Sequence, residues 1–174
     1  MYSLKNPPRV SEVIEFQQTH SHEAFPTKSG GLLSIAFALP VDLVQNFFSY
    51  NQEELRIVPK DIRGLRSYRV ENLPEGQVGG TEFHRLRKEI VMGIAGRVRW
   101  ECEDLYGEKR EFILTPGNGV WMPPFILHTY FTEENRSGLM VVCNTLFPLP
   151  ANPATNDTSS VEEFRKLQES FAKG

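Results

Sequence analysis

The sequence predicts an all-β protein built around a barrel, followed by one C-terminal helix. Three observations support this prediction. From Gly76 onward, short apolar segments alternate with turn residues every ~8–12 positions, as in β-sandwiches and barrels. Between Val98 and Asp104, apolar and charged residues alternate, which is typical of a strand with one dry and one wet face. Between residues 161 and 172, large apolar residues recur at helical spacing instead.

The first 75 residues are expected to form an N-terminal arm, strands and a segment that can act as a lid. Residues 1–9 contain two prolines and suit an extended arm. We expect strands at Val10–Phe16 and Leu32–Leu39, joined by a polar loop whose His-x-His pair, His20 and His22, is interpreted as surface. Val41–Tyr50 suits a helix or a strand, since both periods find apolar partners.

Residues 76–146 are expected to form the barrel core. The turn signals that separate its strands are rich in glycine, proline and asparagine. The predicted strands are Thr81–Leu86, Glu89–Ile94, Arg97–Asp104, Arg110–Leu114, Gly119–Met122, His128–Thr132 and Gly138–Leu146.

Residues 147–174 complete a single domain that spans residues 1–174. A crossing loop rich in proline, asparagine and threonine leads to Ser160-x-x-Glu163, which is a capping box for a helix over residues 161–172. Val161, Phe164 and Leu167 would pack this helix on the outside of the barrel.

Composition narrows the class of protein. The 174 residues are 40% apolar and 24% charged, with a net charge of −3 and no basic stripe, so we expect no nucleic-acid partner. No apolar run reaches the length of a membrane span, and the start lacks a signal core, so a cytoplasmic protein without a membrane partner is expected. Cys102 and Cys143 are predicted to be buried reduced thiols.

Two motifs carry the chemistry: Gly76-x5-Glu82-x-His84-x4-Glu89-x6-Gly96 and Gly117-x5-Pro123-x-Phe125-x2-His128. Residues i and i+2 of a strand face the same side, so Glu82 and His84 are expected to point together into the barrel. Glu89 would join them from the next strand and His128 from the second motif. Two imidazoles and two carboxylates suit Zn, Mn, Fe, Ni or Co, and such a site leaves a position open for water or substrate.

The same residues also suit acid–base chemistry without a metal. Histidine titrates near neutral pH, so His84 is a candidate general base with Glu82 as its partner. His128 or Tyr130 would then be the acid, although a packed ring is the simpler reading of Tyr130. A base beside a sugar carbonyl can remove an α-proton and return it elsewhere, which is isomerisation or epimerisation.

Arg99 and Trp121 are candidate substrate-binding residues. Arg99 can meet a phosphate, and Trp121 can stack on a sugar or a base. The competing interpretations are a solvated strand face for the arginine and core packing for the tryptophan.

The chain resembles the RmlC-like cupins, in particular the WxcM-like group that includes nucleotide-linked 4-keto-6-deoxy-sugar 3,4-ketoisomerases. Gly79–His84 lies where this group has Arg-Gly-x-His-Ala-His, and Gly117–Pro124 followed by His128 is similar to its second motif. Two positions depart from the pattern. Gly79 replaces an arginine expected to help hold the nucleotide diphosphate, and Glu82 replaces the first histidine. The second change moves the cavity toward a metal-ligand set.

The resemblance implies an antiparallel jelly-roll barrel that forms homodimers by sharing an N-terminal strand, here Val10–Phe16. It also implies a small-molecule ligand of the nucleotide-sugar type. Three functional hypotheses remain open at this point. The first is a sugar isomerase or epimerase. The second is a metal-dependent oxygenase, lyase or isomerase with one Zn, Mn, Fe or Ni ion on Glu82, His84, Glu89 and His128. The third is a non-catalytic module that binds a small ligand.

Overall fold

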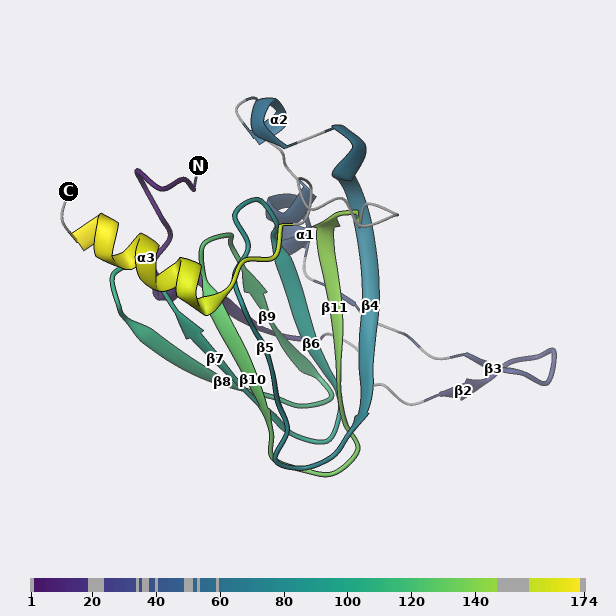
Figure 1. Cartoon of the computed structure of the whole chain (residues 1–174). Coiled ribbons are helices and arrows are strands. Elements are labelled where there is room, and N and C mark those ends of the chain that lie inside the picture. The colour runs from purple at the N-terminus through teal and green to yellow at the C-terminus, as the bar shows by residue number, and fades with distance from the viewer. Residues whose placement is uncertain are drawn as a thin grey trace.

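The computed structural model describes residues 2–18, 24–33, 35, 38–39, 41–48, 52, 54–58, 60–146 and 157–172. Two antiparallel sheets face each other across an apolar interior (Figure 1). The five-stranded sheet has the order β1-β9-β6-β11-β4, and the four-stranded sheet has the order β5-β10-β7-β8. From β4 onward the chain crosses repeatedly between the two sheets, which is the connectivity of a jelly roll.

The bounds of the strands are Ile14–Gln17 (β1), Phe25–Pro26 (β2), Leu32–Leu33 (β3), Arg63–Leu73 (β4), Val78–Glu82 (β5), Glu89–Ala95 (β6), Val98–Glu103 (β7), Lys109–Leu114 (β8), Asn118–Met122 (β9), Leu127–Thr132 (β10) and Ser137–Thr145 (β11). The helices are Val41–Phe48 (α1), Glu54–Ile57 (α2) and Val161–Ala172 (α3), with 3-10 turns at Val10–Glu12 and Lys60–Ile62. Of the two alternatives that the sequence left open for Val41–Tyr50, helix or strand, the structure has the helix over Val41–Phe48. β2 and β3 form a separate hairpin that extends away from the barrel (Figure 1).

Two N-terminal predictions need correction. The expected strand Val10–Phe16 is a 3-10 turn followed by β1, because the Val10 N–H donates to the Asp104 carboxylate at 2.8 Å and turns the chain. The expected strand Leu32–Leu39 is limited to Leu32–Leu33, and part of the remainder lies outside the described residues, as do His20 and His22. β1 pairs antiparallel with β9 of the same chain.

The first motif contains the most consequential correction. The predicted strand Thr81–Leu86 instead ends at Glu82. Phe83 leaves the sheet and pairs with Ser159, with Phe83 N–H donating to the Ser159 carbonyl at 3.1 Å and the reverse bond at 2.9 Å. His84 therefore lies beyond the strand, so strand alternation does not set its direction.

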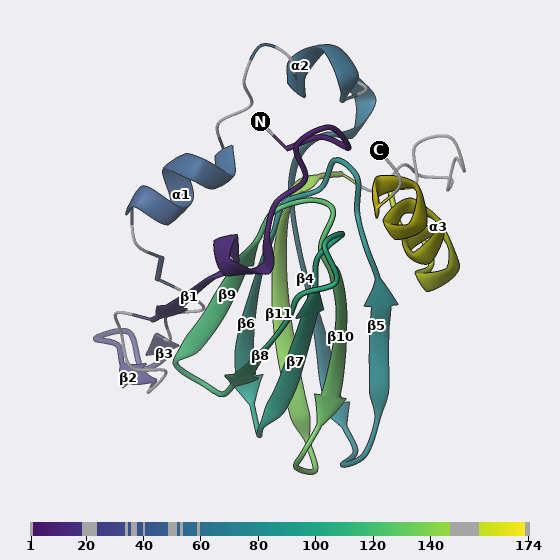
Figure 2. The ribbon, with the colours of Figure 1, turned by 90° about the vertical axis from the view of Figure 1, so that its left-hand side faces the viewer.

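Three apolar clusters hold these elements together. The largest fills the space between the sheets and contains Val91, Trp100 and Met122. A second cluster covers the outer face of the five-stranded sheet, where Leu43 of α1 packs with Trp121 and other residues. The third lies beneath α3. The helices α1 and α3 thus cover opposite sides of the barrel (Figure 2).

The C-terminal helix is confirmed at its predicted position. Ser160 and Glu163 form the expected capping box, with the Ser160 N–H donating to the Glu163 carboxylate at 2.9 Å and the Glu163 N–H donating to the Ser160 hydroxyl at 3.3 Å. Phe164 packs edge-on against Phe83, with ring centroids 5.2 Å apart. This contact anchors the helix next to the first motif.

Two composition-based expectations can be compared with the fold. Cys102 and Cys143 are both buried and free, as predicted, and burial raises the pKa of the Cys102 thiol to about 12. In the part of the chain that the structure describes, no helix has both the length and the apolarity needed to cross a membrane.

Candidate active site

A cavity of about 260 Å³ opens between the two sheets. It combines apolar walls with titratable groups from both sheets, which is the arrangement expected of a small-molecule site. The lining residues are Tyr68, Val70, Gly80, Glu82, Glu89, Trp100, His128, Tyr130, Leu139 and Val141.

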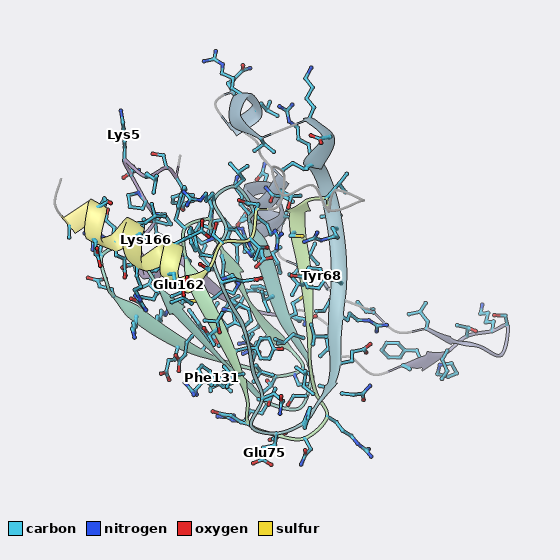
Figure 3. The ribbon with its side chains drawn as sticks, viewed as in Figure 1. Lys5, Tyr68, Glu75, Phe131, Glu162 and Lys166 are labelled. Atoms are coloured by element: carbon cyan, nitrogen blue, oxygen red, sulfur yellow. The ribbon has the colours of Figure 1, made fainter. Side chains whose placement is uncertain are left out.

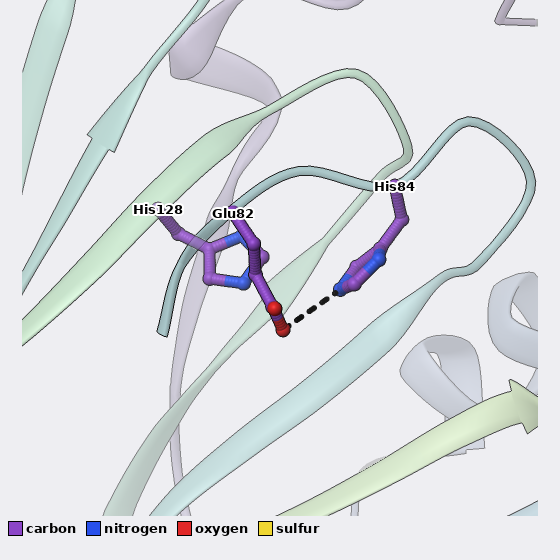
Figure 4. Close-up of side chains that lie close together, drawn as sticks. All are labelled: Glu82, His84 and His128. Atoms are coloured by element: carbon purple, nitrogen blue, oxygen red, sulfur yellow. Dashed lines mark ion pairs between the residues drawn. The ribbon is translucent and has the colours of Figure 1, made fainter. Parts of the chain in front are cut away.

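Glu82, His84 and His128 converge beside this cavity (Figure 4). The Glu82 Oε1 lies 3.7 Å from the His84 Nε2, and the ring centroids of His84 and His128 are 5.3 Å apart. Glu82 is one-third exposed, whereas both histidines are buried. Glu82 reaches His128 because the two are cross-strand partners in the β5–β10 pair.

A buried ion pair backs this cluster. The Arg87 Nη1 donates to the Glu89 Oε1 at 3.2 Å and lies 3.3 Å from the His84 Nε2. Glu89 lies 3.5 Å from His84 and 3.8 Å from His128, so its carboxylate stands between the two imidazoles. Both Arg87 and Glu89 have side chains only 4% exposed, and a buried carboxylate of this kind requires a partner.

Asp157 connects the C-terminal segment to the loop that follows His84. Its carboxylate accepts three successive backbone N–H groups, from Arg85 at 2.9 Å, Leu86 at 2.8 Å and Arg87 at 2.6 Å. Its carbonyl lies 2.7 Å from the His84 Nδ1. A carbonyl only accepts hydrogen bonds, so the Nδ1 of His84 carries a proton and its Nε2 faces the carboxylates.

The environments of the two histidines push their pKa values apart. Burial alone would lower the pKa of His84, but the negative charges of Glu89 and Glu82 outweigh it and raise this pKa above 6.5. Burial lowers the pKa of His128 to about 4, and Glu89 offsets only part of that effect. Burial also opposes ionisation of Glu89, yet His84, His128 and Arg87 hold the pKa of this carboxyl well below its usual range.

His128 is fixed by a hydrogen bond and by ring stacking. Its Nδ1 lies 3.2 Å from the Ile126 carbonyl, so this nitrogen is the donor and the Nε2 keeps its lone pair. Its ring stacks on Trp100 with a centroid separation of 5.1 Å and an interplanar angle of 13°. His128 is therefore a rigid, neutral imidazole at neutral pH, in the wall of the cavity.

Two tyrosines also line the cavity. The Tyr130 ring is nearly parallel to the Trp100 ring, with a centroid separation of 6.5 Å. It fits there because Gly79 and Gly80 have no side chains. A Cβ at Gly79 would overlap the Tyr130 hydroxyl. Tyr68 projects from β4 (Figure 3). Burial and the charge of Glu89 raise the pKa of Tyr68, which keeps its hydroxyl protonated.

The two predicted substrate-binding residues lie away from this cavity. Arg99 sits on the opposite face of β7 from Trp100, where it pairs with Glu101 and Glu133 and covers the ring of Phe131. Trp121 packs in the outer cluster beneath α1. Their positions agree with the alternatives to substrate binding, which were a solvated strand face for Arg99 and core packing for Trp121.

The four predicted metal ligands lie close together. Glu82, His84 and His128 each place one ligand atom within 4.8 Å of the others, and the Glu89 carboxylate lies 3.5 Å from His84 and 3.8 Å from His128. The Glu89 carboxylate is also the counterion of Arg87, whose guanidinium faces the His84 Nε2. A positive guanidinium beside a ligand nitrogen opposes a divalent cation. The metal centre that the sequence suggested stays a prediction, and the Arg87 guanidinium is the feature that opposes it.

Sequence reasoning missed Tyr68, Arg87 and Asp157. Tyr68 lies in the N-terminal part of the chain, where no strand was assigned to its segment. Arg87 falls between the predicted strands Thr81–Leu86 and Glu89–Ile94 and was not considered as a site residue. Asp157 falls in the predicted crossing loop, and no residue near it in the sequence links it to His84.

Comparison with known proteins identifies the fold. No protein-family model matches the chain. No curated protein matches it by sequence. Among solved structures, 190 chains match, and the most similar include nucleotide-sugar enzymes. The two facing sheets and the polar cluster between them thus define an RmlC-like cupin fold, as the motifs predicted.

Three of these structures represent the group. QdtA, a sugar 3,4-ketoisomerase from Thermoanaerobacterium thermosaccharolyticum in complex with TDP, is 14% identical with a TM-score of 0.58, covering 92% of this chain and 97% of QdtA. The TDP-fucose-3,4-ketoisomerase WlaRA from Campylobacter jejuni is 14% identical with a TM-score of 0.55, covering 90% and 96%. The dTDP-4-dehydrorhamnose 3,5-epimerase from Bacillus anthracis, with TDP and PPi bound, is 13% identical with a TM-score of 0.54, covering 87% and 79%.

Proposed function

We propose that this cupin is an enzyme that isomerises or epimerises a keto sugar carried on a nucleotide. The observation that carries the proposal is His128, which lies in the wall of a cavity that is also lined by Tyr68 and Tyr130 and whose Nδ1 is held by the Ile126 carbonyl. The names of the structural neighbours, which include sugar 3,4-ketoisomerases and a 3,5-epimerase, support this reaction class.

The proposed reaction moves protons between neighbouring carbons of the sugar. The Nε2 of His128 accepts the proton from the carbon next to the ketone, and the electron pair of that C–H bond forms a C=C bond. The ketone oxygen takes a proton from the Tyr130 hydroxyl, which gives an enediol. In isomerisation, His128 delivers its proton to the former carbonyl carbon, while the hydroxyl on the original carbon gives its proton to the Tyr130 phenolate and becomes the new ketone. In epimerisation, the enol hydroxyl returns its proton to Tyr130, the original carbon takes a proton from water on its other face, and His128 releases its proton to water.

This assignment moves the role of the base from His84, which the sequence suggested, to His128. His84 does not line the cavity, and its Nε2 faces Glu82 and Glu89. Its pKa lies above that of His128, so it holds a proton at a pH where His128 has none. Two titratable groups with separated pKa values are a signature of acid–base assignment. We therefore propose His128 as base, Tyr130 as acid and His84 as the residue that positions Glu82.

Hydrogen–deuterium exchange in D₂O tests the reaction directly. TDP-4-keto-6-deoxyglucose is incubated with the protein, and deuterium at the carbons beside the ketone is followed by NMR. Loss of a general base typically costs ~10²–10⁴-fold, so His128→Gln is expected to slow exchange by at least ~100-fold. Undiminished exchange in His128→Gln, together with its loss in His84→Gln, would return the base to His84.

The same assay separates this proposal from the alternatives. Thermal stabilisation by TDP or the TDP-sugar, without any deuterium exchange, would favour a non-catalytic binding module. Exchange that requires added metal would favour a metal-dependent cupin. The homodimer, the cytoplasmic location and the nucleotide-sugar ligand remain predictions. Light scattering tests the dimer against the 19.9 kDa mass of one chain.

A further inference from the structure

A buried arginine lies behind the His84 and Glu89 side chains, and the proposed reaction does not use it. The Arg87 side chain is 4% exposed and does not line the cavity. Its Nη1 contacts both Glu89, at 3.2 Å, and the His84 Nε2, at 3.3 Å. Removing such a charge from water is costly, so interactions inside the protein must offset that cost.

This guanidinium occupies a position from which it can neutralise a carboxylate, as a bound metal ion would. In a metal-binding cupin site, a cation would neutralise the carboxylates and hold the imidazoles. Here Arg87 neutralises Glu89, and Glu89 in turn stands 3.5 Å from His84 and 3.8 Å from His128. The charge that the cluster requires is therefore supplied by the chain itself.

The arginine also competes with any metal for the remaining ligands. Glu82, His84 and His128 have ligand atoms within 4.8 Å of one another, close enough to converge on one ion. The His84 nitrogen that would bind the ion is the one that faces the Arg87 Nη1. A divalent ion on this nitrogen would stand beside a fixed positive charge, and like charges placed side by side are strongly unfavourable.

We infer that Arg87 is a resident cation that replaces the metal ion in this barrel and keeps the Glu82, His84 and His128 cluster free of divalent metal. The cluster is then a latent metal site. Removing the guanidinium, with its counterion neutralised, opens that site to an ion that accepts nitrogen and oxygen ligands, such as Co²⁺ or Zn²⁺.

Cobalt titration of the full chain tests this inference. Co²⁺ binding is followed by visible absorption, and bound metal is counted by elemental mass spectrometry after desalting. Arg87→Met alone leaves Glu89 buried without its partner and can fail to fold, so the decisive variant is Arg87→Met/Glu89→Gln, which removes both charges. We expect this variant to bind one Co²⁺ per chain at least ~100-fold more tightly than the wild type.

Three controls assign the effect. Arg87→Lys keeps the charge and is expected to stay metal-free. Arg85→Met removes a charge from the same loop, where the Arg85 side chain covers the ring of Phe83, and is expected to behave as the wild type. Adding His84→Ala to the double variant is expected to abolish Co²⁺ binding.

Two outcomes would overturn the inference. One is a wild-type protein that retains one metal per chain and loses it in His84→Ala. The other is a folded Arg87→Met/Glu89→Gln variant that binds no more Co²⁺ than the wild type. No substrate is present in these measurements, so their result is independent of whether the protein isomerises a sugar.

Discussion

Acid should destabilise this protein through His128, and replacing that residue should remove the effect. The unfolded chain protonates His128 near pH 6.5, whereas the folded chain does so only near pH 4. Between these values the unfolded state binds more protons, so the free energy of unfolding falls as the pH falls. From pH 7 to pH 5 this residue alone accounts for a loss of about 2 kcal/mol.

His84 contributes with the opposite sign. Its folded-state pKa is raised, so the stability it adds is fully present below pH 6.5 and is lost as the pH rises through that raised value. The wild-type profile is the sum of both effects. The difference between wild type and His128→Gln therefore isolates His128.

Urea unfolding at the two pH values is the assay. His128→Gln is expected to lose about 2 kcal/mol less than the wild type between pH 7 and pH 5. NMR titration of the His128 imidazole gives the pKa independently. Parallel pH profiles for the two proteins, or a His128 pKa near 6.5 in the folded state, would refute the reasoning.

Three further predictions concern packing and loop geometry. Asp157→Ala removes three charge-assisted hydrogen bonds from the loop that follows His84, so urea unfolding should show a free energy of unfolding lower by about 3 kcal/mol. The exposed Asp61→Ala should change this free energy by less than about 0.5 kcal/mol. A loss below about 1 kcal/mol for Asp157→Ala would contradict the three-bond geometry. Gly79→Ala places a methyl group against Tyr130, so it should reduce kcat/KM for the keto sugar at least ~10-fold while the protein stays folded. Unchanged kinetics would argue against a role for Tyr130. Trp121→Ala should lower the free energy of unfolding by about 3–5 kcal/mol, since it removes the large side chain at the middle of the outer cluster. Trp121→Phe should leave the KM for the keto sugar unchanged, and a raised KM would place this residue in the site.

Much of the fold follows from local pattern. The strands from β6 to β11 begin and end within three residues of their predicted bounds, because each has an alternating or fully apolar run closed by glycine, proline or asparagine. The C-terminal helix agrees because its cap and its apolar spacing specify the same boundaries. The N-terminal third was less predictable, since a single tertiary hydrogen bond from Val10 to Asp104 replaces the start of an expected strand.

The candidate site was found by spacing, but the expected geometry was wrong in one respect. Glu82 and His84 were placed together by strand alternation, yet β5 ends at Glu82. Glu82 meets His128 through cross-strand pairing, and Asp157 orients His84 from a segment 73 residues away. Contacts across that distance in the chain leave no local pattern.

By itself, the sequence determined the succession of strands of a β barrel, because hydrophobic periodicity and turn residues act locally. The resemblance of its two motifs to the RmlC-like cupins placed Glu82, His84, Glu89 and His128 near the interior of that barrel. The tertiary structure alone decided the environment of each of those groups. It buried Arg87 against Glu89, separated the pKa values of His84 and His128, and turned Arg99 and Trp121 away from the cavity. The physical reason is that the pKa, the burial and the orientation of a side chain depend on neighbours that come together only when the two sheets pack against each other.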